Sequence, residues 1–311
     1  MRYNALVIGC GNIGAGYDLN TKDVLTHAKA FSLRKNIIFS VADIDEKSAK
    51  KVAKKYKIGY RTQLSAEELG TFDLVSICTA TQSHYDYLAQ LSKLPDMPFI
   101  ICEKPVIGSL KQFASLKKLQ LDPNKILVNY IRRFQPGYRL LQKRLQQILM
   151  TDRISHVIVR YQRGILNNGS HALDLLNFLT NETTTIISDV KIASKTYDAF
   201  SYDPTLSGNL LLNSSIPVSL IGFTNVSFSI FELEIYTGSW KISIEESGNT
   251  IRYFKNRKGE LIEDKRLLQS NVLKDYMIPV VDYAIDCLGN KKETNFESAL
   301  SLNNIILKNL A

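Results

Sequence analysis

Three glycines near the start of the 311-residue chain have the spacing G-x-G-x-x-G, a pattern that can bind phosphate. Gly9, Gly11 and Gly14 follow an apolar run at 5–8 that is typical of a buried parallel strand. In this motif the first glycine permits a tight turn, the second lets a pyrophosphate approach the backbone, and the third lets a helix pack closely on the strand. The exposed N–H groups of such a turn favour an anion. The context predicts a dinucleotide site, while a strand ending in a flexible turn is the alternative.

An aspartate ends the next predicted strand, over residues 37–43. Asp43 follows Gly14 by 29 positions, whereas the motif places its acidic residue about 20 positions on. The turn-forming residues at 16–21 predict an inserted loop that accounts for the difference, with a helix resuming near Lys22. A carboxylate here accepts hydrogen bonds from both ribose hydroxyls and repels a 2′-phosphate, which favours NAD over NADP. The alternative is that Asp43 only caps the next helix.

Strands and helices alternate over residues 1–130. Further strands are expected at 73–79, 99–102 and 126–130, and polar side chains follow the first of these at 79–84. Ligands bind at the carboxyl ends of strands in open α/β sheets. The alternation predicts a parallel, right-handed, doubly wound sheet of the Rossmann type.

The pattern changes after about residue 150, where short strands alternate apolar and polar residues. These strands are expected at 154–163, 184–195, 207–213, 216–225, 229–237, 239–246 and 250–255. They predict a large, mostly antiparallel sheet, interrupted by a helix at 173–179 and followed by helices at 271–288 and 297–309. We therefore expect two domains, 1–130 for the dinucleotide and 131–311 for the substrate and for contacts between subunits.

The composition narrows the class of protein. The formal charge of +9, from 39 basic and 30 acidic residues, favours anionic small molecules. Nucleic acid is not expected, because no basic block is interleaved with aromatic residues. No apolar run is long enough for a membrane span, and we expect a soluble cytoplasmic protein. Disulfides and metal sites are not expected, because the four cysteines lack C-x-x-C spacing. They are Cys10, Cys78, Cys102 and Cys287.

Three further segments complete a recognisable set: EKP at 103–105, NYIRRFQP at 129–136 and NNGSHALD at 167–174. With the glycine motif and Asp43, they make nearly the whole chain similar to the glucose-fructose oxidoreductase / inositol dehydrogenase / MocA family. The resemblance implies an N-terminal Rossmann domain and a C-terminal α/β domain whose open sheet often makes oligomer contacts. A homodimer or homotetramer built through this sheet is expected, because antiparallel strands rich in apolar residues need cover on both faces unless one face is polar. It also implies hydride exchange between NAD and a carbohydrate-like alcohol or ketone, which is a sugar, a nucleotide sugar or a polyol.

The resemblance also implies a set of site residues. Lys104 would lie near the reacting oxygen, where an ammonium stabilises developing negative charge. His171 would move the hydroxyl proton, since its unperturbed pKa lies near neutrality, and Asp174 would orient its ring or bind a sugar hydroxyl. Asn167 stands where the family commonly has aspartate, and Ala80 where it has proline. The expected cofactor site comprises Gly9, Gly11, Asn12, Ile13, Gly14, Asp43, Thr79, Ala80, His84, Glu103 and Lys104. The expected substrate site comprises Lys104, Arg132, Arg133, Asn168, His171 and Asp174.

The sequence leaves alternatives for the role of the two arginines and for the activity. Arg132 and Arg133 either bind a phosphate or carboxylate of the substrate or form ordinary ion pairs. The loss of the acidic residue at Asn167 keeps alive a non-catalytic dinucleotide-binding sensor of the same fold. Among enzymes, an imine or enone reductase is the nearest rival to a sugar dehydrogenase.

Overall fold

The chain folds into two compact units. The structure is a computed structural model, and it describes residues 2–181, 186–289 and 291–309. One unit contains Met1–Ile131 and Asp275–Leu300, and the other contains Arg132–Lys274 and Ser301–Ala311. The C-terminal helices are thus divided between the two units. Each unit is described here by itself.

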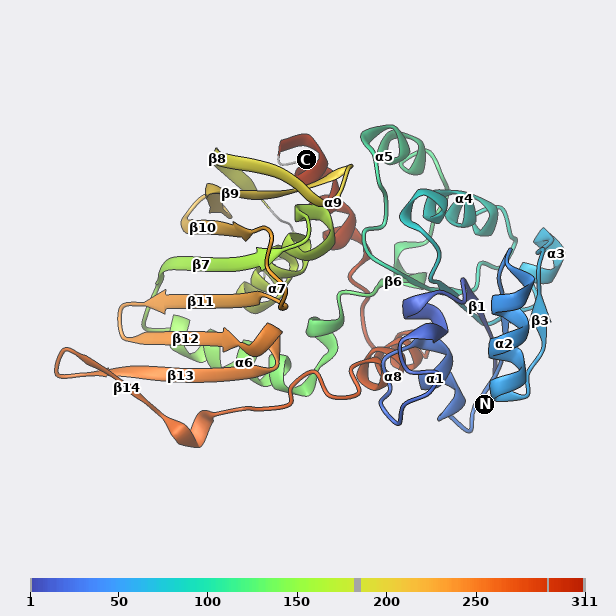
Figure 1. The fold of residues 1–311 in the computed structure, drawn as a ribbon, viewed down its shortest axis with the longest axis horizontal. Coiled ribbons are helices and arrows are strands. Elements are labelled where there is room, and N and C mark those ends of the chain that lie inside the picture. Colours follow the sequence, from blue (N-terminus) through green and yellow to red (C-terminus); the bar gives the residue numbers. More distant parts are fainter. Residues whose placement is uncertain (1, 182–185, 290, 310–311) are drawn as a thin grey trace. The chain divides into compact units, whose positions relative to one another are not determined.

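The first unit is built on six parallel strands in the order β3-β2-β1-β4-β5-β6 (Figure 1). They are β1 (Tyr3–Ile8), β2 (Ile37–Ala42), β3 (Tyr60–Arg61), β4 (Leu74–Ile77), β5 (Phe99–Cys102) and β6 (Ile126–Val128). The residues of β4, β5 and β6 are buried throughout, which explains why their sequences are continuous apolar runs. The strand order reverses between β1 and β4, which is the switch point where such sheets bind ligands. The predicted doubly wound sheet is confirmed.

The first unit also contains helices, of which all but the last in the chain connect these strands. They are the π-helical turn η1 (Asn12–Gly16), α1 (His27–Ser32), α2 (Glu46–Tyr56), α3 (Ala66–Leu69), α4 (Thr81–Leu91), α5 (Leu110–Leu116) and α8 (Met277–Leu288). Side chains of Asp45, Ser65 and Ser109 cap the starts of α2, α3 and α5. Within the described part of the chain, no helix has the length and apolar character needed to cross a membrane.

The inserted loop ends later than the sequence predicts. The prediction that a helix resumes near Lys22 was wrong, because α1 begins only at His27. The buried Asp18 carboxylate accepts the N–H groups of Leu25 and Thr26 at 2.5 and 2.8 Å and also the Thr26 hydroxyl at 2.7 Å. These bonds hold residues 18–26 as a closed loop, and Thr26 then caps the helix.

The second unit is built on eight strands in the order β14-β13-β12-β11-β7-β10-β9-β8. They are β7 (Ile154–Gln162), β8 (Ile187–Phe200), β9 (Asp203–Leu212), β10 (Ile216–Phe223), β11 (Phe231–Thr237), β12 (Trp240–Glu245), β13 (Thr250–Arg257) and β14 (Glu260–Glu263). All neighbours are antiparallel except β7 and β10, so the predicted mostly antiparallel sheet is confirmed. Residues 184 and 185 of the expected strand 184–195 lie outside the described residues.

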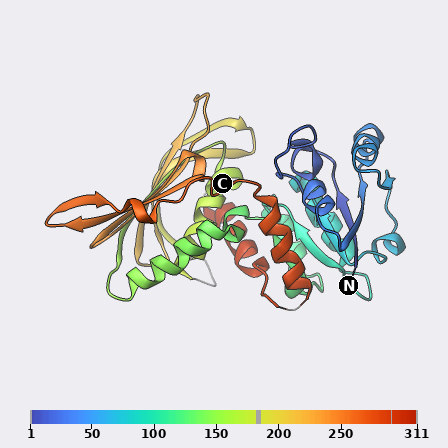
Figure 2. The same ribbon diagram turned by 90° about the horizontal axis from the view of Figure 1, so that it is seen from below.

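Helices of the second unit lie along one face of this sheet. Figure 2 shows α6 (Pro136–Leu149) and α7 (Ser170–Thr180), in green, against the yellow and orange strands. The short π-helical turn η4 (Ile165–Gly169) leads from β7 into α7. The last helix is α9 (Phe296–Asn309). Val157, Val159 and Tyr161 of β7 point into the core between sheet and helices and are fully buried.

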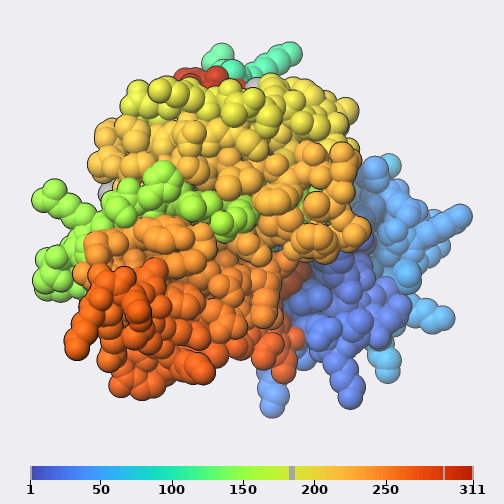
Figure 3. Space-filling view, turned by 60° about the vertical axis from the view of Figure 1, so that its left-hand side comes forward, coloured from blue at the N-terminus to red at the C-terminus, as the bar shows by residue number. Residues whose placement is uncertain are grey.

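The opposite face of the eight-stranded sheet carries charges. Figure 3 shows this face as a continuous surface of strand residues, from yellow to orange. Glu234 pairs there with Arg160 at 3.2 Å and with Lys241 at 2.5 Å, and Arg252 pairs with two further glutamates at 2.9 and 2.8 Å. Apolar side chains such as Ile221 lie among these pairs. The face is therefore mixed rather than apolar, which weakens the argument that it must be covered.

Candidate active site

In the glycine turn at the carboxyl end of β1, there is open space beside Gly11 but none beside Gly14. A Cβ atom on Gly14 would lie 1.9 Å from the carbonyl oxygen of Gly9, so this glycine is needed for the strand and η1 to pack. A Cβ atom on Gly11 would meet nothing within 4 Å among the described residues. The space in front of Gly11 is where the motif places a pyrophosphate. The turn therefore fits a dinucleotide.

A hollow of about 360 Å³ lies at the ends of β1 and β2, next to this turn. It is lined by Ile8, Ala42, Asp43, Ile44, Thr62, Gln63, Leu64, Tyr87 and Gln90. Asp43 accepts the N–H of Cys10 at 2.6 Å and that of Asp45 at 2.8 Å. Each carboxylate oxygen has a second lone pair, so Asp43 can hold the turn and still accept ribose hydroxyls. Burial, with a contribution from Asp43, raises the pKa of the Cys10 thiol to about 12, which keeps it neutral.

A cation is also present near Asp43, but it is engaged elsewhere. Arg61 of β3 donates from Nη1 to the Ser40 hydroxyl at 2.9 Å and from Nε to Glu68 at 3.3 Å, and its guanidinium lies over the ring of Phe72. Arg61 does not line the hollow that contains Asp43. The residues around the hollow thus fit an unphosphorylated ribose better than a 2′-phosphate.

A buried hydrogen-bond network supports the turn that carries Lys104. His27 Nε2 lies 2.9 Å from Glu103 Oε1, the Asn129 amide donates to the same oxygen at 2.6 Å, and His27 Nδ1 lies 3.1 Å from the Ser76 hydroxyl. Burial alone would raise the pKa of Glu103, but the bonds from His27 and Asn129 and the charge of Lys104 lower it. Glu103 is therefore an ionised anchor directly before Lys104. Nothing in the local sequence around His27 indicates this partner 76 residues away.

Lys104 itself is half-buried, at the carboxyl end of β5. Its peptide bond to Pro105 is cis. Since β1, β4 and β5 are parallel neighbours, Lys104 and the glycine turn lie at the same edge of one sheet. The first unit thus combines a dinucleotide turn with a lysine at the same edge.

His84 lies in a different setting from the one expected. Its ring is buried in α4 and lies between the carbonyl oxygens of Pro105 at 2.9 Å and Thr79 at 3.0 Å. Burial lowers the pKa of His84, while the hydrogen bonds to the two carbonyl oxygens act to raise it. The geometry makes His84 a brace between the loop after β4 and the turn after β5.

In the second unit, Asp203 holds the start of the segment that leads to His171. Its buried carboxylate accepts the N–H groups of Leu166 and Asn167, each at 2.8 Å. A Cβ atom on Gly164, whose φ is +86°, would lie 2.0 Å from this carboxylate. The approach of Asp203 therefore requires glycine at position 164. The sequence does not point to Asp203, because this residue begins β9, far along the chain from the turn that it supports.

Two amide side chains fasten η4 to the end of β7. Asn167 Nδ2 donates to the carbonyl oxygen of Arg163 at 3.1 Å, and Asn168 Nδ2 donates to that of Gln162 at 2.9 Å. An aspartate at 167 could not donate the first of these bonds. His171 follows half-buried in the first turn of α7.

The two neighbouring arginines have partners within their own unit. Arg133 pairs with the buried carboxylate of Asp174 in α7. Arg132 is buried, its guanidinium lies 3.5 Å from the ring centre of Phe231, and its Nη2 donates to the carbonyl oxygen of Ser247 at 3.2 Å. This arrangement fits the ion-pair alternative for Arg133 better than an anion site.

Comparison with known proteins shows what the first unit resembles. A sequence profile described as "Oxidoreductase family, NAD-binding Rossmann fold" matches residues 3–130. This stretch of the first unit is thus similar to the Gfo/Idh/MocA oxidoreductase family.

A curated relative matches a longer stretch of the chain. Inositol 2-dehydrogenase of Rhizobium meliloti (strain 1021) is 26% identical over 215 residues, covering 63% of this chain and 62% of the relative. The alignment thus spans less than two thirds of that curated relative.

Solved structures share the fold over nearly the whole chain. UDP-N-acetylglucosamine 3-dehydrogenase GnnA from Acidithiobacillus ferrooxidans has a TM-score of 0.76 at 15% identity, covering 99% of this chain and 95% of its own. An oxidoreductase from Agrobacterium radiobacter, in complex with NAD+, L-tartaric acid and magnesium, has a TM-score of 0.70 at 16% identity, covering 99% and 94%. Among the described residues of this chain, no group of three or more His, Cys, Asp or Glu side chains is arranged to hold a metal ion.

Proposed function

We propose that this protein is an NAD-dependent oxidoreductase that transfers hydride between the nicotinamide and a carbohydrate-like alcohol or ketone. The observation that carries the proposal is the edge of the six-stranded sheet, where the space before Gly11, the carboxylate of Asp43 and the half-buried Lys104 follow β1, β2 and β5 of one parallel sheet. The names of the relatives support it, since they include an inositol dehydrogenase and a nucleotide-sugar dehydrogenase.

The residues would divide the chemistry between them. NAD, when bound, supplies or accepts the hydride. Lys104 would hydrogen-bond the substrate oxygen and stabilise its developing charge, with Glu103 as its ionised neighbour. His171 would give or take the hydroxyl proton. Asp174, paired with Arg133, would position the helix that carries His171 rather than exchange protons itself.

NAD is favoured over NADP because Asp43 lines the hollow and Arg61 is engaged by Glu68. We also propose a cytoplasmic location and assembly into a homodimer or homotetramer through the mixed face of the eight-stranded sheet. An interface there would keep Glu234 and Lys241 paired with each other, so that neither charge would be buried without a partner.

The test is transfer of deuterium. The protein is titrated with NADH by fluorescence and then incubated with 4-deuterated NADH and a panel of keto-sugars and keto-inositols. We expect NADH to bind and one class of ketone to gain deuterium at the carbinol carbon, detected by mass spectrometry. Failure to bind NADH would contradict the proposal outright. Binding with no deuterium in any product would favour the sensor alternative.

A further inference from the structure

The amide side chain of Asn129 follows β6 in the first unit, and the residue is only 1% exposed. Its Nδ2 donates to Glu103 Oε1 at 2.6 Å and to Met277 Sδ at 3.5 Å. These contacts determine the orientation of the amide, because the reversed orientation would place an amide oxygen against the Glu103 carboxylate. The amide oxygen, Oδ1, is buried and has no hydrogen-bond partner among the described residues.

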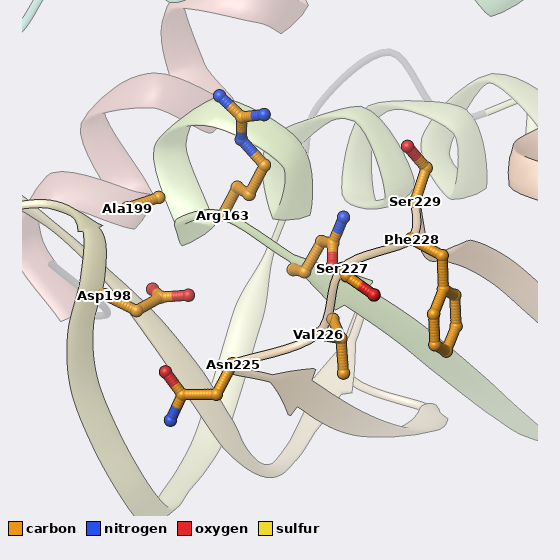
Figure 4. A pocket seen from close by; sticks show the side chains of 9 residues that line it. Arg163, Asp198, Ala199, Asn225, Val226, Ser227, Phe228 and Ser229 are labelled. Carbon is orange, nitrogen blue, oxygen red and sulfur yellow. The ribbon is translucent and has the colours of Figure 1, made fainter.

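A buried acceptor without a partner is unusual, and two other asparagines show the contrast. Asn295, also buried in the first unit, accepts the N–H of Val128 at 2.8 Å and donates to the carbonyl oxygen of Val128 at 2.9 Å, so both ends of its amide are paired. Asn225 lines a hollow of about 370 Å³ in the second unit (Figure 4), where it is exposed and water can reach its amide. Asn129 is buried like Asn295, so its oxygen points to a donor that a ligand supplies.

The place of Asn129 in the sheet indicates which ligand group this is. Doubly wound sheets bind the two halves of a dinucleotide on the two sides of the point where the strand order reverses, here between β1 and β4. Asp43 follows β2, on one side of this point. Lys104 and Asn129 follow β5 and β6, on the other side. With Asp43 on the adenosine ribose, the nicotinamide half of NAD belongs on the side of Asn129.

The side chains around Asn129 leave it as the acceptor for nicotinamide. The ring of nicotinamide carries one donor group, the NH2 of its carboxamide. A lysine ammonium only donates, so Lys104 cannot accept a hydrogen bond from this group. Glu103 Oε1 already accepts from His27 and from Asn129. The neutral oxygen of Asn129 is therefore the acceptor that matches an amide N–H.

We infer that Asn129 binds the nicotinamide end of NAD, with Oδ1 accepting a hydrogen bond from the carboxamide. The inference rests on the proposed oxidoreductase function and adds a residue to its cofactor site. A bond to the carboxamide limits rotation of the ring, and hydride transfer requires a ring held in one orientation.

The test compares the binding of three ligands by calorimetry: NADH, its reduced acetylpyridine analogue and ADP-ribose. The analogue has a methyl ketone in place of the carboxamide and so lacks the NH2 donor, while ADP-ribose lacks the whole ring. Asn129→Leu removes the acceptor and keeps a side chain of similar size. Asn295→Leu is the matched control, because it removes a buried amide whose printed partners belong to Val128 of the same strand. Thermal melts check that each variant folds.

We expect the unaltered protein to bind NADH about tenfold more tightly than the acetylpyridine analogue, as for loss of a hydrogen bond to a buried acceptor. Asn129→Leu should raise the Kd of NADH about tenfold and so remove the difference between NADH and the analogue. The Kd of ADP-ribose should stay within about twofold, because the interaction lost involves the ring alone. Asn295→Leu should keep the preference for NADH over the analogue.

Equal binding of NADH and the analogue by the unaltered protein would overturn the inference, and this measurement needs no variant to fold. An equal rise in Kd for NADH and the analogue in Asn129→Leu, or no rise for NADH, would also overturn it. Deuterium transfer alongside any of these results would leave the proposed function standing. The expected pattern of Kd values without deuterium transfer to any ketone would contradict the proposed function and leave this inference standing. Failure to bind NADH would overturn both.

Discussion

Arg133 holds both oxygens of the buried Asp174 carboxylate through one nitrogen, with Nε 2.8 Å from Oδ1 and 2.7 Å from Oδ2. Burial raises the pKa of Asp174 above its ordinary value of 3.8, against the pull of Arg133. A raised carboxyl pKa favours folding fully only below 3.8, and this contribution is lost as the pH rises through the folded pKa. The ion pair between Arg133 and Asp174 is thus most important for folding stability at neutral pH, where the carboxyl is charged.

The variant Arg133→Met should therefore destabilise the protein by about 3–5 kcal/mol at pH 7, because it leaves a buried charge without its partner. The loss should be smaller at pH 5 than at pH 7, because removing Arg133 raises the pKa of Asp174 further and a larger fraction of the carboxyl is protonated at the lower pH. The double variant Arg133→Met/Asp174→Asn should recover much of the stability. Urea unfolding at the two pH values measures this, and an equal loss at both would contradict it.

Gly11 and Gly14 should respond differently to alanine. Gly14→Ala drives a Cβ atom into the Gly9 carbonyl, so we expect a loss of stability of roughly 1–3 kcal/mol. Gly11→Ala should change stability by less than about 1 kcal/mol, but it should weaken NADH binding by about tenfold or more, because its methyl group fills the expected pyrophosphate site. Thermal melts and fluorescence titration measure the two effects. Gly59→Ala is the control, and normal NADH binding by Gly11→Ala would place the cofactor elsewhere.

Removing the charge of Asp43 should change the choice of cofactor. Asp43→Asn should weaken NADH binding by about tenfold, as expected for hydrogen bonds to a charged group, and shift the preference towards NADPH. Asp45→Asn, which alters the cap of α2, is the matched control. Calorimetry with both cofactors measures the ratio of affinities. Tighter binding of NADPH than NADH by the unaltered protein would contradict the assignment.

Assembly should depend on the mixed face of the eight-stranded sheet. Ile221→Asp, on that face, should convert a dimer or tetramer to monomer at micromolar concentration, because it buries an unpaired charge in the interface. Met150→Asp, at the exposed end of α6, should not. Sedimentation velocity measures the mass, and a monomeric unaltered protein would refute the assembly.

The parts of the fold that local sequence determines were predictable. The apolar run before Gly9, the acidic end of β2 and the alternation of later strands each depend on residues close together in the chain, and both sheets follow from them. Helical periodicity predicts a helix over residues 271–288, of which the structure forms 277–288. It cannot show which core this helix joins. The start of α1 was missed because it depends on the bonds of Asp18 to residues seven and eight positions later.

The candidate site also has one part that the local sequence predicts and another part that it does not. Lys104 and His171 come from motifs, whereas their supports come from distant strands and helices. His27 reaches Glu103 across 76 positions, and Asp203 reaches the N–H groups of η4 across 36 and 37 positions. No period or spacing encodes such pairs, so only the folded structure shows them.

The most direct test of the central claim is kcat for NADH-dependent reduction of the ketone that the panel identifies, in the unaltered protein and in Lys104→Met. We predict a loss of about a hundredfold or more for Lys104→Met and for His171→Ala, as expected when acid–base or electrostatic groups are removed. The Kd of NADH should stay within about twofold, and Lys111→Met, on the exposed surface of α5, should behave as the unaltered protein. Near-full turnover by Lys104→Met would contradict the account.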